Sequence, residues 1–223
     1  GLPSAAVKES RDRVRAAISV SGLSFPFGKV TVNLAPADVK KEGTAFELAI
    51  AVALLAARSP EAFCGLGGTM LLGELALDGR LMPVRGALGM AITAARQGVR
   101  ALILPRANAR ECECVAGLTV YPAETLLQVC GHLSGKEPLA AQPAARYEAF
   151  ASDEPAAFDL KYVKGQPAGR KALEIAAAGG HNLLMTGIPG SGKTMLARCL
   201  PGILPPMTYE EALETTLIHS AAG

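Results

Sequence analysis

The chain has 223 residues, half of them hydrophobic, and a formal net charge of +2. This length fits one or two domains, and the near-neutral charge excludes the strongly basic balance of a dedicated nucleic-acid-binding domain. No apolar run reaches the ~20 charge-free residues of a membrane span, so we expect no membrane segment.

Five cysteines are scattered along the chain. The closest pair, Cys112 and Cys114, has no second pair that would complete a zinc motif. We therefore expect reduced thiols in a cytoplasmic protein.

The first 134 residues alternate helical and strand patterns. An amphipathic pattern after Ser4 predicts a helix that Gly22 ends. Lys29–Leu34 alternates with period two, as a strand does. The apolar run Glu47–Ala57 predicts a buried helix, since it is too short for a membrane span.

The middle of this half continues the alternation. Asp78-Gly79 separates the apolar runs Thr69–Gly73 and Gly79–Val84, which predicts a hairpin. The further predicted elements are a helix from Gly86 to Gly98, strands at Arg100–Pro105 and Leu118–Tyr121, and a helix from Glu124 to His132. Such alternation indicates an α/β or α+β fold.

The composition changes after residue 134. Gly135–Pro155 is rich in Ala, Pro and Glu and has no apolar period, which favours a surface linker. We predict one domain over 1–134, a linker over 135–157 and a second domain from 158 to 223. The elements predicted there are helices at Arg170–Ala177, from Lys193 through Leu200 and at Glu210–His219, and a strand at Asn182–Met185.

A phosphate-binding loop is the strongest motif in the chain. The pattern G-x-x-x-x-G-K-[ST] is completed by Gly187, Ile188, Pro189, Gly190, Ser191, Gly192, Lys193 and Thr194. Glycines let successive N–H groups face an anion, and the following helix adds its positive end. Lys193 would reach the β- and γ-phosphates of ATP, and the Thr194 hydroxyl would hold Mg²⁺.

The residues around the loop make the motif specific. An apolar strand pattern precedes it and a helical pattern follows it, as this mechanism requires. Hydrolysis also needs an acidic strand and usually a neighbour's arginine. No apolar strand ending in Asp-Glu follows Thr194, so we expect no catalytic residue and no turnover in this chain by itself.

Several runs resemble the magnesium-chelatase-related AAA+ ATPases of the ComM/YifB type. They are Gly165-Gln166, Ala172–Met185, the loop Gly187–Thr194, Leu204–Leu213, Ile218–Gly223 and, earlier, Val7–Ala17 and Val32–Asp38. The chain opens at Gly1-Leu-Pro without Met, and we expect it to cover only the front of a longer protein.

The resemblance implies a Lon-protease-like first domain with a ribosomal S5-like fold, followed by the start of an AAA+ α/β domain. It also implies a cytoplasmic ATPase that assembles as a hexameric ring. ComM-type members are implicated in natural transformation as DNA branch-migration motors, so DNA is a possible partner. The alternatives are a chelatase-like or protein-remodelling ATPase, and a module that binds nucleotide without turnover.

The same resemblance predicts that the first domain is not a protease. The place of the Lon-type serine is taken by Ala45, and no lysine follows the turn Pro83–Gly86. Thr44 is expected to cap the buried helix, and Arg85 stays protonated and cannot act as a base. We therefore expect a pseudo-protease that serves binding or assembly.

The first helix carries Lys8, Arg11, Arg13 and Arg15. This charged face is the best candidate for contacting nucleic acid. The alternative is a solvated face in which Glu9 and Asp12 balance the cations.

Overall fold

The computed structural model describes residues 5–34, 43–63, 65–144 and 158–222. The chain forms two compact units, which are described separately below. Unit 1 comprises residues 1–146 and 213–223, and unit 2 comprises residues 147–212.

Unit 1 is built on a parallel three-stranded sheet in the order β1-β4-β5. Its strands are β1 (Thr69–Leu71), β4 (Ala101–Pro105) and β5 (Thr119–Ala123). In the register Thr69 faces Ala101, which faces Thr119. The described helices of the unit are α1 (Ala5–Val20), α2 (Glu47–Arg58), the 3₁₀ turn η1 (Pro60–Ala62), α3 (Ala87–Arg96), α4 (Arg106–Cys112) and α5 (Leu126–Leu133).

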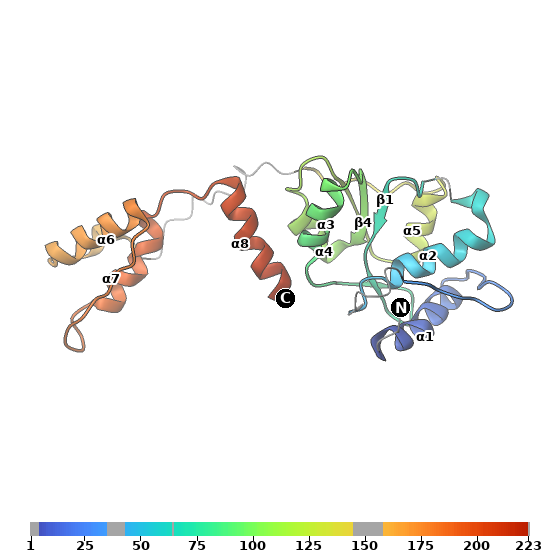
Figure 1. Cartoon of the computed structure of the whole chain (residues 1–223), viewed down its shortest axis with the longest axis horizontal. Coiled ribbons are helices and arrows are strands. Elements are labelled where there is room, and N and C mark those ends of the chain that lie inside the picture. The colour runs from blue at the N-terminus through green and yellow to red at the C-terminus, as the bar shows by residue number, and fades with distance from the viewer. Residues whose placement is uncertain (1–4, 35–42, 64, 145–157, 223) are drawn as a thin grey trace. The chain divides into compact units, whose positions relative to one another are not determined.

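The central strand β4 separates two apolar cores. Leu102 and Leu104 belong to a cluster with α3 and α4, whereas Ile103 belongs to a cluster with α1, α2 and α5. Successive side chains of a strand point to opposite faces, so the sheet buries both of its faces under helices. Figure 1 shows α3 on one side of β4 and α2 and α5 on the other. The predicted α/β class is confirmed.

The predicted hairpin exists with a different first arm. β2 (Glu74–Leu75) pairs antiparallel with β3 (Leu81–Met82) around Asp78-Gly79. Thr69–Leu71 instead pairs parallel with β4, because its apolar side chains complete the sheet core. Helix α4, which was not predicted, makes the short connection between β4 and β5.

The strand predicted at Lys29–Leu34 is wrong. The segment belongs to no strand among the described residues, and Val30 and Val32 are exposed. Period two fits a strand, but a strand also needs a neighbour that accepts its backbone hydrogen bonds. Helices predicted near Ser4–Val20, Glu47–Ala57, Gly86–Gly98 and Glu124–His132, and strands near Arg100–Pro105 and Leu118–Tyr121, are confirmed within a few residues.

Unit 2 holds a helix pair. Its elements are η3 (Leu160–Tyr162), α6 (Pro167–Gly179), α7 (Lys193–Cys199) and η4 (Leu200–Ile203). Leu173, Leu196 and Cys199 form its buried core with Leu160 and Val163. Helix α8 (Tyr209–Ala222) belongs to unit 2 up to Ala212, and its later residues Leu213 and Leu217 pack in unit 1.

The predicted linker is described only in part. Residues 135–144 form no helix or strand, and the rest of the predicted linker, 145–157, lies outside the described residues. The part of the chain that the structure describes has no helix long and apolar enough to cross a membrane.

Candidate functional site

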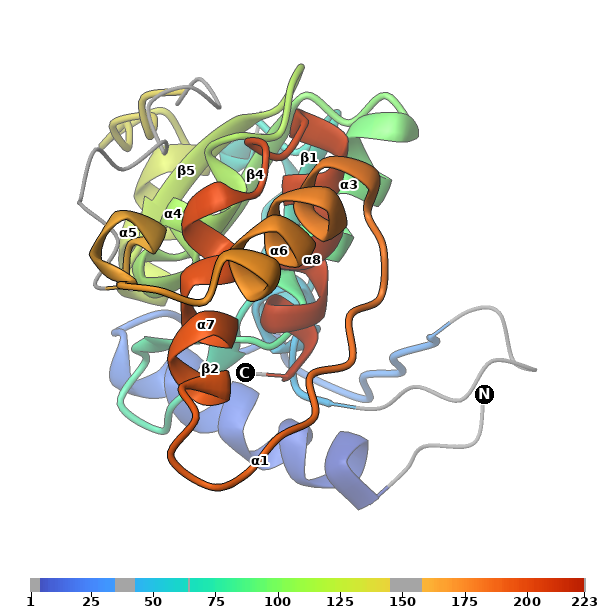
Figure 2. The ribbon, with the colours of Figure 1, turned by 90° about the vertical axis from the view of Figure 1, so that its left-hand side faces the viewer.

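The predicted phosphate loop joins an extended segment to α7. Figure 2 shows the chain running back from the end of α6 to a hook that enters α7. Gly190 and Gly192 adopt left-handed backbone conformations with φ of 79° and 84°. Residues with a Cβ rarely adopt these angles, so the tight turn depends on glycine at both positions.

Lys193 folds back over this loop. Its Nζ donates to the carbonyl oxygens of Gly187 and Ile188 at 2.9 and 2.8 Å, and to the Ser191 hydroxyl at 3.2 Å. An ammonium group has three donors and no acceptor, and each of these oxygens can take one donor. The loop therefore curls around a fixed positive charge.

Helix α6 supports the loop from its N-terminal end. Gln166, which precedes α6, donates from its side-chain amide to the Ser191 carbonyl oxygen. A Cβ on Gly169 would lie 3.0 Å from Leu196 Cδ1, so α6 and α7 pack closely at this glycine. Gln166 belongs to the run Gly165-Gln166 that carries the family resemblance, but the sequence alone predicts no role for it.

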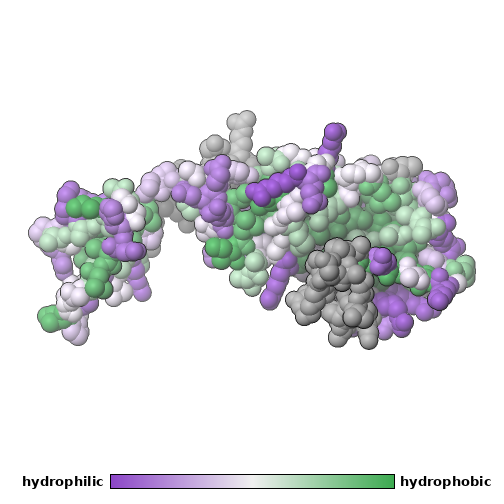
Figure 3. Space-filling view, in the orientation of Figure 1, coloured by the Kyte–Doolittle hydropathy of each residue, from purple (hydrophilic) through white to green (hydrophobic). Residues whose placement is uncertain are grey.

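The strand predicted at Asn182–Met185 is wrong in this structure. The residues are extended but belong to no strand, and Leu184 and Ile188 are 87% and 77% exposed. The described residues of unit 2 contain no strand, so the segment has no neighbour there to accept its backbone hydrogen bonds. Figure 3 shows hydrophobic surface on this unit.

Arg13 does not fit the predicted nucleic-acid-binding face of the first helix, because its side chain is engaged inside unit 1. Its Nη2 lies 2.6 Å from Glu47 Oε1, and its side chain is only 18% exposed. Arg11 pairs with Asp12, and the Arg15 guanidinium lies over the Phe25 ring. The Lys8 side chain lies outside the described residues. The alternative of a charge-balanced face is favoured.

Glu47 is a buried carboxylate that the sequence analysis did not single out. It accepts hydrogen bonds from the Ser10 hydroxyl at 2.6 Å, the Arg13 guanidinium and the Leu75 backbone N–H at 2.8 Å. A lone charge that opens an otherwise apolar helix was the signal that could have found it. Glu47 ties α1, α2 and β2 together.

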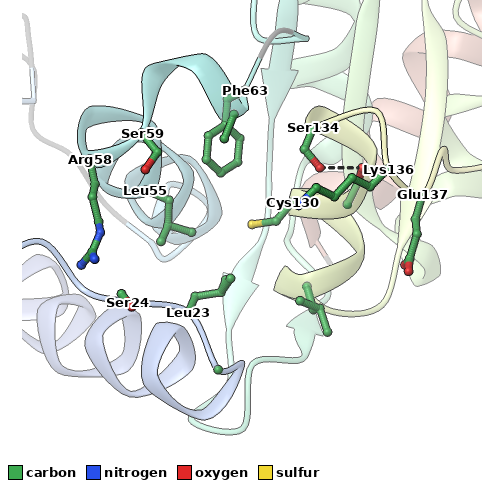
Figure 4. A pocket seen from close by; sticks show the side chains of 14 residues that line it. Leu23, Ser24, Leu55, Arg58, Ser59, Phe63, Cys130, Ser134, Lys136 and Glu137 are labelled. Atoms are coloured by element: carbon green, nitrogen blue, oxygen red, sulfur yellow. Dashed lines mark hydrogen bonds between the residues drawn. The ribbon is translucent and has the colours of Figure 1, made fainter.

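Unit 1 also contains a pocket of about 470 Å³ between α2, α5 and the segment after α1. Figure 4 shows its apolar wall of Leu23, Leu55 and Phe63, with Cys130 facing them from α5. Arg58 at its edge donates to the Phe25 carbonyl oxygen.

Cys130 should alkylate slowly. Burial raises the pKa of its thiol to about 11, so at pH 8 only about one molecule in a thousand is thiolate, against roughly a fifth for a free cysteine. We expect iodoacetamide to label it about 200-fold more slowly than in the unfolded chain, with a rate that rises about tenfold per pH unit. Residue-resolved mass spectrometry measures this, and equal rates in folded and unfolded chains would contradict it.

The four described cysteines are free thiols, as predicted: Cys112, Cys114, Cys130 and Cys199. Cys64 lies outside the described residues. Burial also raises the pKa of Cys112 to about 12. Buried thiols of this kind are inert at neutral pH.

Comparison with known proteins places the chain in a family. The family model "Subunit ChlI of Mg-chelatase" matches residues 1–108, and the model "Magnesium chelatase, subunit ChlI" matches residues 159–223. The protein YifB of Salmonella typhimurium is 50% identical over 220 residues, which are 99% of this chain and 42% of that protein. Competence protein ComM of Haemophilus influenzae is 44% identical over 222 residues, 99% of this chain and 43% of that protein.

The chain belongs to the magnesium-chelatase-related proteins of the ComM/YifB type. It spans less than half of the length of these two relatives. A weaker similarity links this ComM/YifB-type chain to the Lon protease of Brevibacillus choshinensis, 28% identical over 115 residues, 49% of this chain and 14% of that protease.

The residues at the predicted protease position form a structural contact in this ComM/YifB-type chain. The Thr44 hydroxyl donates to the Glu74 carboxylate, and Phe46 occupies the N-cap of α2 without a side-chain bond. The prediction that Thr44 caps this helix is therefore wrong, because its hydroxyl ties the loop to β2 instead. Ala45 packs against the apolar cluster that contains Leu88.

Proposed function

We propose that the loop Gly187–Thr194 binds the phosphates of ATP together with Mg²⁺. The observation that carries this proposal is the position of Lys193, whose ammonium lies among the oxygens of its own loop. Phosphate oxygens would compete for the same three donors. Gly190 and Gly192 have left-handed backbones and no side chain that could cover their own N–H groups.

Each residue has a role in this proposal. Lys193 contacts the β- and γ-phosphates, and the loop's backbone N–H groups hold their oxygens. The Thr194 hydroxyl is the ligand for Mg²⁺, a hard ion that prefers oxygen. Bound Mg²⁺ would supply positive charge that neutralises the phosphates.

For the whole protein we propose an ATP-driven motor that remodels DNA, assembled as a hexameric ring. The similarity to competence protein ComM over 99% of this chain supports this reading. The match to two models of a magnesium-chelatase subunit supports a second candidate, a chelatase-like or protein-remodelling ATPase. The third candidate is a nucleotide-binding module without turnover.

A branch-migration assay separates these candidates. The full-length protein is expected to move a synthetic branched DNA junction when ATP is supplied, and its Lys193→Ala variant is expected not to. ATP hydrolysis that DNA neither stimulates nor requires would favour the chelatase-like reading. ATP binding without hydrolysis would favour the third.

We further propose that unit 1 is a Lon-like domain without protease activity. Ala45 and Leu88 share an apolar cluster, and the nearby Thr44 hydroxyl is engaged by Glu74. A Lon-type site uses a lysine as its base, but no lysine follows the turn Pro83–Gly86, and Arg85 stays protonated and cannot replace it. A serine-reactive probe that labelled the wild-type chain but not the Thr44→Ala variant would overturn this proposal.

A further inference from the structure

Gln166 has an unusual backbone conformation. Its φ is 54°, and among the described residues it is the one non-glycine residue with a positive φ. This left-handed region costs a residue with a Cβ roughly 1 kcal/mol or more, and glycine would enter it without that cost. A glutamine at this position is therefore expected to use its side chain for a contact that glycine could not make.

The side chain of Gln166 makes a long-range contact. Its Nε2 donates to the carbonyl oxygen of Ser191, 25 residues further along the chain. It also lies beside Gly192, where a Cβ would come within 3.4 Å of the same Nε2. Gln166 thus touches the two residues that immediately precede Lys193.

The backbone of Gln166 is held firmly enough to make this contact useful. Its carbonyl oxygen accepts the Arg170 N–H at 3.0 Å, the first hydrogen bond of α6. Helix α6 in turn packs on α7 where Gly169 meets Leu196. The Leu196 N–H donates to the Gly192 carbonyl oxygen at 2.9 Å, so the far end of the loop is fixed to α7.

This contact sets the direction of one peptide group. In a trans peptide the C=O and the following N–H point in opposite directions. Because the Ser191 carbonyl oxygen points to Gln166, the Gly192 N–H points away from Gln166. A free Ser191–Gly192 peptide, flanked by glycine, could rotate and turn its carbonyl oxygen toward an anion instead.

We propose that Gln166 is a positioning residue for the phosphate loop. It holds the Ser191–Gly192 peptide so that the Gly192 N–H, and not the Ser191 carbonyl oxygen, faces the nucleotide's phosphates. This inference rests on the proposed ATP site and adds a residue outside the loop motif to it.

Gln166→Gly is the decisive variant. Glycine enters the left-handed backbone without strain and removes the side chain with its amide, so the melting temperature of the nucleotide-free chain should stay the same or rise. The dissociation constant for MgATP should increase about fivefold, as expected for losing one side-chain hydrogen bond that orders the site. Isothermal titration calorimetry and thermal melting measure the two quantities.

Two further variants serve as controls for Gln166→Gly. Gln166→Asn keeps an amide that tolerates the left-handed region but is one methylene shorter, so it should weaken MgATP binding to a similar extent. Ala168→Gly adds a neutral glycine in the first turn of α6 and should leave the affinity unchanged. If Gln166→Gly misfolds, Gln166→Asn decides the question.

The outcomes separate this inference from the ATP site itself. Wild-type affinity in both Gln166 variants, with binding lost in Lys193→Ala, would overturn the positioning role and leave the ATP site standing. Failure of the wild-type chain to bind MgATP would overturn both. Equal weakening in Ala168→Gly would assign the effect to the helix end and would contradict a role for the amide.

Discussion

Replacing Glu47 by alanine is expected to lower the free energy of unfolding of unit 1 by about 3 kcal/mol. The carboxylate is 1% exposed and neutralises Arg13, whose side chain is mostly buried. Removing it leaves the Leu75 N–H without its acceptor, and it takes from Arg13 Nε and Nη2 and from the Ser10 hydroxyl the hydrogen bonds that they make to Glu47. A buried group that loses its partner keeps its full desolvation cost.

Chemical denaturation followed by circular dichroism measures this loss. Glu9→Ala is the matched control, because Glu9 also pairs with Arg13 at 2.8 Å but is 72% exposed. Exposed ion pairs contribute at most about 1 kcal/mol, so this variant should lose about 0.5 kcal/mol or less. Similar losses in the two variants would contradict the role assigned to the buried carboxylate.

Replacing Lys193 by alanine is expected to weaken MgATP binding by about 100-fold or more. The ammonium supplies charge-assisted hydrogen bonds, which are roughly twice as strong as neutral ones. It also neutralises the loop's own carbonyl oxygens, with Nζ 2.9 Å from Gly187 and 2.8 Å from Ile188. Without it those oxygens would repel the phosphates.

The control for this variant is Lys171→Ala. Lys171 lies on α6, its side chain is 71% exposed, and its Nζ lies 3.3 Å from Glu174 Oε2. Replacing it by alanine therefore changes the net charge by the same amount as Lys193→Ala without removing a contact to the loop. Its affinity for MgATP is expected to stay within about twofold of wild type. If both variants weakened MgATP binding equally, the loss would come from the change in net charge, and a direct contact between Lys193 and the phosphates would be contradicted.

Elements with strong local signals were predicted well. The alternation of Leu102, Ile103 and Leu104 between two apolar clusters follows from a strand buried on both faces. The loop's glycines and Lys193 could also be found in advance, because the motif depends on spacing along the chain.

Features that depend on distant partners could not be predicted. Strand β1 was assigned to the hairpin, since nothing local shows that Thr69 pairs with Ala101. Thr44 has the right residue type for a cap, but Glu74, 30 residues away, takes its hydroxyl. The Gln166 contact likewise spans 25 residues, and only the folded helix pair brings its amide to Ser191.

The segment before the phosphate loop could not be predicted correctly for the same reason. Asn182–Met185 has a strand's composition, yet its apolar residues Leu183 and Leu184 remain exposed. Propensity for strand reflects packing against neighbours more than an intrinsic backbone preference. The described residues of unit 2, 158–212, offer no neighbouring strand on which that preference could act.

Isothermal titration of the wild-type chain with MgATP, ADP and AMP tests the central claim most directly. Lys193 is proposed to contact the β- and γ-phosphates, so ATP and ADP should bind and AMP should bind at least about 100-fold more weakly. Equal affinity for AMP and ATP, or no binding of any of the three, would contradict a phosphate site at Gly187–Thr194.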